Sequence, residues 1–281
     1  MTTPSATTDT MTGSIRKMRT TGGDPVQYVL PVGDDLFAID QCIGKQLNLT
    51  HTGNIHCISC GRQTKKSFSQ GYCFPCFKSL AECDMCIMRP ETCHHHMGTC
   101  RDENWAERHC MQPHYVYLAN SSGLKVGITR ENQIPTRWFD QGATQAIPLF
   151  KVKNRYHSGL VEANLKKLIS DRTDWRKMLK GNAEKKDLVQ EATELLASAE
   201  ESLNKLESET PDLSLQRCQD ASVDIDFPVK VFPEKVTSFN FDKTPEVGGL
   251  LNGIKGQYLI FEGGVINLRK FSGYEIKVEA G

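Results

Sequence analysis

The sequence lacks long apolar segments. None of its 281 residues lies in a run approaching the ~18 apolar residues of a membrane-spanning helix, so we expect no membrane partner. The stretch from Met1 to Thr12 is rich in Thr and Ser and has no apolar core of a secretory signal, which favours a cytoplasmic location. Thiols stay reduced in the cytoplasm, so clustered cysteines there indicate metal binding in preference to disulfides.

The chain also lacks net charge, because 34 Lys and Arg balance 34 Asp and Glu. The balance is uneven along the sequence: residues 57–180 hold 19 basic and 11 acidic residues, whereas residues 181–226 hold 4 and 12. A basic middle section predicts a polyanionic partner such as DNA or RNA. A zinc site built from four thiolates carries a net charge of about −2 and would offset part of this excess.

Cysteine is concentrated in one block. Nine of the eleven cysteines lie between Cys57 and Cys110. Within this block two Cys-x2-Cys pairs, Cys57/Cys60 and Cys73/Cys76, are separated by twelve residues. Pairs at this spacing can place four sulfurs tetrahedrally around one Zn²⁺. We therefore predict a structural zinc site with Cys57, Cys60, Cys73 and Cys76 as its ligands.

A second set of metal ligands follows directly. Its candidates are Cys83, Cys86, Cys93, Cys100, Cys110 and the histidines His94–His96. Cys83 and Cys86 repeat the pair spacing, and Cys100 with Cys110 would complete four thiolates, for which Cys93 or one histidine could substitute. The block has neither a His-Glu-x-x-His nor a His-x-Glu pattern, so a second structural zinc is favoured over a catalytic one.

Patterns of apolar and turn residues divide the chain into sections. We predict a disordered lead over residues 1–23, a β section over 24–56, the cysteine block over 57–113, an α/β domain over 114–181, an acidic amphipathic helix over 182–210 and a C-terminal β section over 211–281. Neither β section is long enough to bury a core alone, so we expect the two to pair around the inserted middle. The last section is expected to contain strands at 230–232, 237–241, 257–261, 265–268 and 274–278.

The stretch after the cysteine block predicts a β-hairpin with two distinct faces. Residues 115–119 and 124–129 alternate in polarity around the turn at 120–123. One face is apolar, with Val116, Leu118, Val126 and Ile128. The other face carries Tyr115, Tyr117, Lys125, Gly127 and Thr129, and leaves room for a ligand beside the backbone.

Two charged residues further along the chain complete this polar face. Arg137 lies near the expected start of a helix after Pro135. Glu162 lies on a later helix and falls off the apolar stripe formed by residues such as Val161 and Leu165, so it can face the polar side of the sheet.

These residues resemble the motifs of the GIY-YIG nucleases. The series Tyr115-Val116-Tyr117, Lys125-Val126-Gly127, Arg137 and a helical Glu162 is similar to that fold, and most similar to the subset whose second motif reads Lys-Ile-Gly. The stretch from Gly53 to Gly181 also resembles an uncharacterised bacterial family of unknown function. The matching words are Cys57-Ile58-Ser59-Cys60-Gly61-Arg62, Gly71-Tyr72-Cys73, Gly98-Thr99-Cys100-Arg101 and Arg137-Trp138.

The nuclease resemblance implies a three-stranded antiparallel sheet between helices that hydrolyses phosphodiesters with one divalent metal. In that reaction Tyr117 would orient the attacking water and Arg137 would stabilise the charge on the phosphate. Glu162 would hold Mg²⁺ or Mn²⁺, since a carboxylate is a hard oxygen ligand.

The chain departs from the nuclease pattern at two points. Lys125 replaces the tyrosine of the second motif, where a lysine could bind phosphate but changes how water is activated. Asn154 and Asn164 are the candidates for a later asparagine of the family. Both departures bear more on catalysis than on nucleic-acid binding.

The sequence thus predicts an α+β protein: a Cys-rich zinc-ribbon or knuckle block joined to a small GIY-YIG-like sheet with helices, flanked by N- and C-terminal β-rich sections. The leading hypothesis is a zinc-stabilised, metal-dependent nuclease. The alternatives are a non-catalytic DNA- or RNA-binding protein with a degenerate nuclease core, and a zinc-braced scaffold whose partner is a protein. Phosphate contacts would come from Arg62, Lys65, Lys66, Lys125, Arg130, Arg137, Lys151, Lys153 and Arg155.

Overall fold

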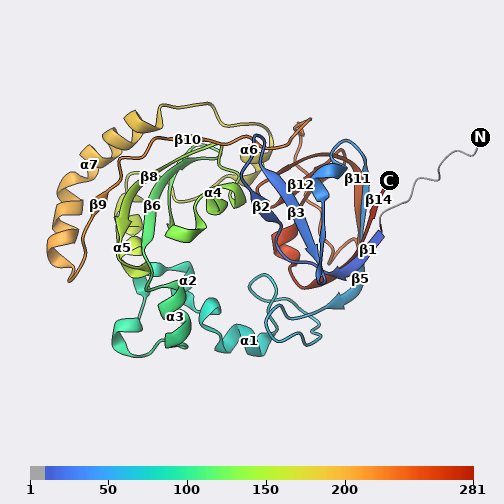
Figure 1. Ribbon diagram of the computed structural model, residues 1–281, viewed down its shortest axis with the longest axis horizontal. Helices are drawn as coiled ribbons and strands as arrows, with labels where there is room; N and C mark the ends of the chain where they lie inside the picture. The colour runs from blue at the N-terminus through green and yellow to red at the C-terminus, as the bar shows by residue number, and fades with distance from the viewer. Residues whose placement is uncertain (1–9) are drawn as a thin grey trace, which may run out of the picture. The chain divides into compact units, whose positions relative to one another are not determined.

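The computed structural model describes residues 10–281, and this part of the chain forms two compact units (Figure 1). Unit 1 contains the chain up to Phe77 together with residues 179–181 and 226–281. Unit 2 contains residues 78–178 and 182–225. Both units contain antiparallel sheets, so the protein is a mixed α and β structure with a cysteine cluster. Among the described residues, no helix has the length and apolar character needed to cross a membrane.

Unit 1 is built on a six-stranded sheet in the order β1-β14-β5-β11-β12-β13. Its strands are β1 (Thr10–Ser14), β5 (Gln46–Ile55), β11 (Glu246–Lys255), β12 (Tyr258–Phe261), β13 (Gly264–Asn267) and β14 (Tyr274–Ala280). Strand β5, from the N-terminal β section, lies between β11 and β14 from the C-terminal section. The predicted pairing of the two sections is therefore confirmed, and their apolar side chains form a common core.

A smaller sheet in unit 1 joins β2 (Arg19–Thr21), β3 (Gln27–Val32) and β4 (Asp35–Phe37), and short 3-10 helices lie at Ile39–Cys42 and Leu268–Phe271. The prediction of a disordered lead is wrong for residues 10–14 and 19–21, which form β1 and β2. The buried side chains of Ile15 and Met18 hold this segment in place. Residues 1–9 of the predicted lead lie outside the described part of the chain.

From the sequence alone, Gly248, Gly249 and Gly253 would suit turns or tight barrel corners, whereas in the structure they lie within strand β11. An added Cβ at Gly253 would lie 2.5 Å from Val229 Cα, and one at Gly248 would collide with Asn48 on β5. These glycines permit close approach of neighbouring backbones within the sheet. The strands expected at 230–232 and 237–241 are not formed; that stretch pairs through isolated bridges at Val229 and Ser238 only.

Unit 2 contains a sheet in the order β10-β8-β6-β7. Its central strands are β6 (His114–Asn120), β7 (Leu124–Arg130) and β8 (Gln145–Val152). Two short strands, β9 (Gln216–Arg217) and β10 (Val223–Asp224), extend it beside β8, so part of the section predicted as C-terminal β belongs to unit 2. The predicted hairpin is present as β6 and β7, with Val116 opposite Ile128 and Tyr117 opposite Gly127.

Two helices cover the apolar face of this sheet: α5 (Arg155–Leu165) and α7 (Leu188–Glu209). Val116 and Leu118 of β6 pack in one core with Leu165 of α5 and Leu203 of α7. Helix α7 begins later than the predicted residue 182. Asp187 accepts hydrogen bonds from the backbone N–H groups of residues 189 and 190, which fixes the helix start.

The remaining helices are short. They are α1 (Phe74–Ser79), α2 (Met85–Met88), α3 (Glu103–His109), α4 (Thr136–Asp140) and α6 (Trp175–Leu179), with 3-10 helices at Ala81–Cys83, Pro90–Thr92, His95–Met97 and Glu131–Gln133. In the cysteine block such short elements bury little apolar area, so they need another source of stability.

Candidate metal centres and candidate active site

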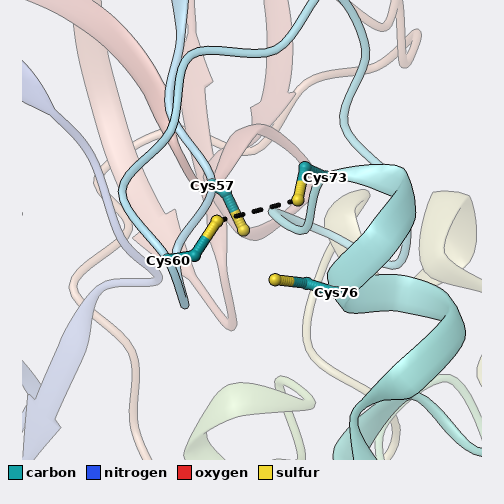
Figure 2. A group of neighbouring side chains, drawn as sticks. All are labelled: Cys57, Cys60, Cys73 and Cys76. Atoms are coloured by element: carbon teal, nitrogen blue, oxygen red, sulfur yellow. Dashed lines mark hydrogen bonds between the residues drawn. The ribbon is translucent and has the colours of Figure 1, made fainter.

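The four cysteines of the first predicted zinc site converge on one point (Figure 2). Their sulfur atoms all lie within 4.8 Å of one another, and the Sγ atoms of Cys60 and Cys73 are 3.8 Å apart. Zn–S bonds of about 2.3 Å in a tetrahedron place sulfurs about 3.8 Å apart. The spacing therefore fits a single zinc ion, and four soft thiolates are the donor set that zinc prefers.

Local backbone structure explains how the sequence forms this cluster. Gly61 N–H donates to the carbonyl of Cys57 (2.9 Å), and Gly61 has a φ of 73° that closes the first knuckle. Cys73 precedes helix α1 and Cys76 lies in its first turn, so both sulfurs leave the same end of that helix. The cysteine spacing thus produces the cluster through two tight turns.

The backbone also prepares the thiol of Cys57 for metal binding. Burial raises the pKa of this thiol, but hydrogen bonds from the backbone of Cys60, Cys73 and Ser59 outweigh burial and bring the pKa down to about 6. Zinc binds thiolates, so N–H donors that stabilise sulfur charge fit a metal-binding role. The nearby Arg62 adds positive charge beside Cys60.

The second cysteine set gathers around a small cavity of ≈ 10 Å³ in unit 2, which has room for about one water-sized particle. Cys86, Cys93, Cys100 and Cys110 all line it, and Cys83 does not. Burial raises the pKa of both Cys86 and Cys110 to about 11, with upward contributions from the other thiols. Several thiols that line one buried cavity ionise together only when a cation lies among them.

A carboxylate that the sequence did not single out lies at the same cavity. Asp84, Cys86 and His94 have ligand atoms within 4.8 Å of one another. Asp84 also accepts a charged hydrogen bond from Arg101 Nε at 2.7 Å. Arg101 belongs to the motif Gly98-Thr99-Cys100-Arg101. In this structure its guanidinium holds Asp84 beside the thiols.

Of the predicted catalytic residues, Tyr117, Lys125 and Arg137 gather on the polar face of the sheet, and Glu162 of α5 lies within range of their charges. The Tyr117 ring is fully buried, and this burial raises the pKa of its hydroxyl; the charge of Arg137 and hydrogen bonds from Gln141 and Arg137 oppose the rise without cancelling it. Burial lowers the pKa of Lys125 to about 8; the charge of Arg137 lowers it further and the charge of Glu162 opposes the change. Arg137 and Glu162 are half-buried, so they form the solvent-facing part of the group. The alternation along β6 and β7 therefore predicts this clustering.

Gln141, which the sequence did not single out, links two members of this group. Its Nε2 donates to the Tyr117 hydroxyl at 2.5 Å, and its Oε1 accepts a hydrogen bond from Lys125 Nζ. Gln141 follows Arg137 by four residues at the end of α4, so both side chains leave the same side of the helix. Only that spacing could have indicated its position from the sequence.

The electrostatics of Glu162 suit a divalent cation. Burial raises its pKa to about 7, and the carboxylate of Asp171 adds to the rise, while Lys166, Arg155 and Arg137 oppose it. A divalent cation between two carboxylates would relieve both burial of charge and mutual repulsion. One or two carboxylates are the usual protein ligands of Mg²⁺. The Glu162 carboxylate therefore fits such an ion, and the exposed Asp171, whose carboxylate is paired with Lys166 and Arg172, adds negative charge near it.

Neither candidate asparagine belongs to this group. Asn154 Oδ1 accepts from the backbone N–H of His157 at 2.8 Å and so caps helix α5. Asn164 exchanges hydrogen bonds with Ser202 of α7, including one of 2.8 Å. Both amides hold helices in place.

The second cysteine set braces helix α5, which carries Glu162. Gly159 of α5 packs against Pro90 and Glu91, and an added Cβ there would lie 2.6 Å from the Glu91 nitrogen. At the start of α5, Arg155 donates from its guanidinium to the Ile87 carbonyl (2.7 Å) and from its backbone to the Cys110 carbonyl (2.8 Å). The segments that carry the second cysteine set therefore contact α5, the helix that carries Glu162.

Several of the predicted phosphate-contacting residues have partners within unit 2. Lys151 pairs with Glu131 at 2.5 Å and Lys153 with Asp212 at 3.3 Å. The guanidinium of Arg155 is occupied by the Ile87 carbonyl. The remaining predicted contacts are Arg62, Lys65, Lys66 in unit 1 and Lys125, Arg130 and Arg137 in unit 2.

Comparison with known proteins gives a family and no function. A family model described as "Protein of unknown function (DUF2797)" matches residues 44–276. No curated protein and no solved structure matches the chain. The match covers both cysteine sets and the Tyr117 group, so all of these features lie within the family's region.

Proposed function

The chain belongs to the DUF2797 family, and we propose that it is a zinc-stabilised nuclease that hydrolyses nucleic-acid phosphodiesters with a divalent metal. The observation that carries this proposal is the clustering of Tyr117, Lys125 and Arg137 on one face of the sheet in unit 2, with the charge of Glu162 within their reach. A half-buried carboxylate, an arginine and a phenol this close together form a site that could bind a phosphodiester together with a cation.

These four side chains differ in solvent exposure, and we assign them different roles accordingly. Arg137 and Glu162 are half-buried, so they can reach a substrate. Arg137 would bind the phosphate and stabilise the charge that builds on it as water attacks the phosphorus and the leaving oxygen departs. A divalent cation held by Glu162 would supply Lewis acidity at the phosphate and the water.

Tyr117 and Lys125 act as positioning residues in this proposal. Tyr117 is fully buried and Lys125 is 6% exposed, so neither reaches bulk water. The Tyr117 hydroxyl bonds Arg137 and Gln141, and Lys125 bonds the same glutamine. These contacts fix the direction of the Arg137 guanidinium, and precise orientation is a large part of catalytic rate.

We further propose that the protein holds two structural zinc ions. The first uses Cys57, Cys60, Cys73 and Cys76, whose sulfur geometry supports it most directly. The ligands of the second are Cys86, Cys93, Cys100 and Cys110, which share a cavity of ≈ 10 Å³. The second ion would hold α2, α3 and the start of α5 together, and so would support Glu162.

The burial of Tyr117 and Lys125 also supports a second candidate function. Because Tyr117 and Lys125 are shielded from water, the described residues of this group offer no exposed protein base beside Arg137 and Glu162. This observation favours a protein that binds DNA or RNA through Arg137 and neighbouring basic residues without cleaving it. Such binding would weaken steeply with salt.

One assay separates the two functions. Labelled DNA and RNA, single- and double-stranded, are incubated with Mg²⁺ or Mn²⁺ and wild-type protein, Glu162→Gln or Arg137→Ala. The matched controls are Glu201→Gln, an exposed residue of α7, and Arg217→Ala, an exposed residue of β9. The nuclease proposal expects losses of about 100-fold or more in the two site variants and none in the controls. Absence of cleavage by wild type, with salt-sensitive binding retained, would establish the binding protein instead.

A further inference from the structure

A cavity of ≈ 490 Å³ lies in unit 2 beside the Tyr117 group. This volume falls within the range of about 300–1,000 Å³ that small-molecule pockets occupy. Its walls come from β6, α4, β8 and the segment after α7, and include Tyr115, Pro135, Trp138, Pro148 and Val223. Two aromatic rings and two prolines give it flat, rigid and mostly apolar walls.

The cavity adjoins the proposed site for the scissile phosphate. Tyr115 is two residues before Tyr117 and shares its face of β6. Trp138 directly follows Arg137 on α4, and its ring meets the Tyr117 ring edge-on, with centroids 6.1 Å apart. Pro148, which lines the cavity, is the β8 residue paired with Tyr117. The cavity therefore shares three of its lining residues with the surroundings of Tyr117, the residue that contacts Arg137.

One wall of the cavity carries a buried hydrogen-bond donor without an acceptor. Trp138 is 3% exposed, and its Nε1 has no hydrogen-bond partner among residues 10–281. The indole N–H can only donate, and buried indoles usually have an acceptor. Because solvent does not reach this nitrogen, an acceptor atom on a ligand in the cavity would supply it only after a turn of the Trp138 ring toward the cavity. Nucleobases carry such atoms on every edge.

The charges at the rim favour a neutral ring over a second phosphate. Glu131 and Asp220 both line the cavity. Glu131 is paired with Lys151, whose Nζ lies 5.8 Å from the centroid of the Tyr115 ring. The carboxylate of Asp220 would repel a phosphate, whereas it can accept hydrogen bonds from the amino groups of a base.

We propose that the cavity lined by Tyr115 and Trp138 binds one unpaired nucleobase of the substrate. This inference rests on the proposed nucleic-acid function and adds the substrate class, since a base can enter a concave pocket only when it is unpaired or flipped out of a duplex. Tyr115, which is half-buried, supplies the stacking surface, and the buried Trp138 supplies a wall and a donor.

The test measures binding without added Mg²⁺ or Mn²⁺, so that cleavage does not enter the result. Fluorescence anisotropy compares a single-stranded oligonucleotide with an abasic oligonucleotide of equal length and phosphate number. The proteins are wild type, Tyr115→Leu and Trp138→Phe. The control is Trp175→Phe, a tryptophan on α6 that does not line the cavity.

Wild type and Trp175→Phe are expected to prefer the base-containing strand by roughly 5- to 100-fold, and Tyr115→Leu and Trp138→Phe to lose most of that preference. Affinity for the abasic strand should be equal in all four proteins. Cross-linking of wild type to a strand containing 5-iodouracil gives a second readout, which needs no variant to fold, and should modify the peptide that contains Tyr115.

Equal preference in all four proteins, with cross-links elsewhere, would overturn the base pocket. The nuclease proposal would survive that result if Mg²⁺-dependent cleavage still required Glu162. Conversely, a base preference that depends on Tyr115, without cleavage by wild type, would support the pocket in a binding protein. Failure of wild type to bind either strand at low salt would overturn both proposals.

Discussion

The ring of Tyr117 lies directly against the backbone of Gly127. The two residues are paired across β6 and β7, and an added Cβ at Gly127 would lie 2.6 Å from the Tyr117 hydroxyl oxygen. The glycine therefore creates the space in which the tyrosine reaches Gln141 and Arg137. The second motif, Lys125-Val126-Gly127, thus has glycine at its third position because Tyr117, the last residue of the first motif, packs against it.

Replacing Gly127 with Ala is expected to displace the Tyr117 ring. The free energy of unfolding should fall by about 1–3 kcal/mol, because the ring is fully buried and has no space to move into. Any cleavage activity should fall as well, since Tyr117 holds Arg137. Urea denaturation and the cleavage assay measure the two effects. Gly181→Ala is the matched control, because an added Cβ there has nothing within 4 Å; equal stability of the two variants would contradict this account.

Removal of zinc is expected to unfold the first cysteine cluster. Cys60→Ser should lower the bound zinc by about one equivalent and reduce the thermal stability, because the short turns and helix α1 bury little apolar surface. Cys218→Ala, a half-buried cysteine outside the block, should retain full zinc content. Elemental analysis and thermal melts provide the readouts, and an unchanged melt after chelation would argue against a structural metal.

Two cysteines of the second set, Cys83 and Cys100, allow a direct test of which residues bind zinc. Cys83 and Cys100 are both half-buried, but only Cys100 lines the cavity with Cys86 and Cys110. Cys100→Ala is therefore expected to lose about one zinc equivalent, whereas Cys83→Ala should keep the content of wild type. Metal analysis of the two purified variants decides the matter; a zinc loss in Cys83→Ala alone would show that the ligand set is assigned incorrectly.

Because Lys255 of unit 1 is buried, we expect the free energy of unfolding to rise with pH in the alkaline range. Burial lowers its pKa to about 8 from an ordinary value of 10.5. Between these values the unfolded chain binds more protons than the folded chain, so the folded state gains stability as pH rises through this window, by roughly 3 kcal/mol at most. Urea unfolding across the window should show this rise in wild type and lose it in Lys255→Met.

Lys277→Met is the control for Lys255, because the Lys277 side chain is 45% exposed. It should keep the slope of wild type, since an exposed ammonium is solvated in both states. Identical slopes in Lys255→Met and wild type would mean that Lys255 titrates in the folded protein as it does in water.

Sequence patterns predicted the features that depend on short-range spacing. The first zinc ligands follow from two Cys-x2-Cys pairs, and the polar face follows from alternation around Tyr117 and Lys125. Features that depend on three-dimensional packing were missed. Gln141 joins the site only because α4 places it above β6, and Asp84 reaches the second cavity only because Arg101 holds it.

Strand β11 shows the limit of composition-based reasoning. Glycine usually weakens a strand, so its glycines at 248, 249 and 253 suggested turns. In the structure the missing side chains let β5 and the segment at Val229 approach the β11 backbone. Nothing in the local sequence distinguishes a glycine that ends a strand from one that admits a neighbour, because the neighbour comes from a distant part of the chain.

The position of β5 between β11 and β14 has a consequence for the order in which the protein forms during synthesis. Residues 78–225 leave the ribosome before either partner of β5 has been made, so unit 2 can fold while β5 still has two open edges. Only the last strand, Tyr274–Ala280, gives β1 its neighbour and closes one of those edges. Loss of those seven residues would therefore leave the beginning of the chain without its place in the sheet and expose strand edges that favour aggregation.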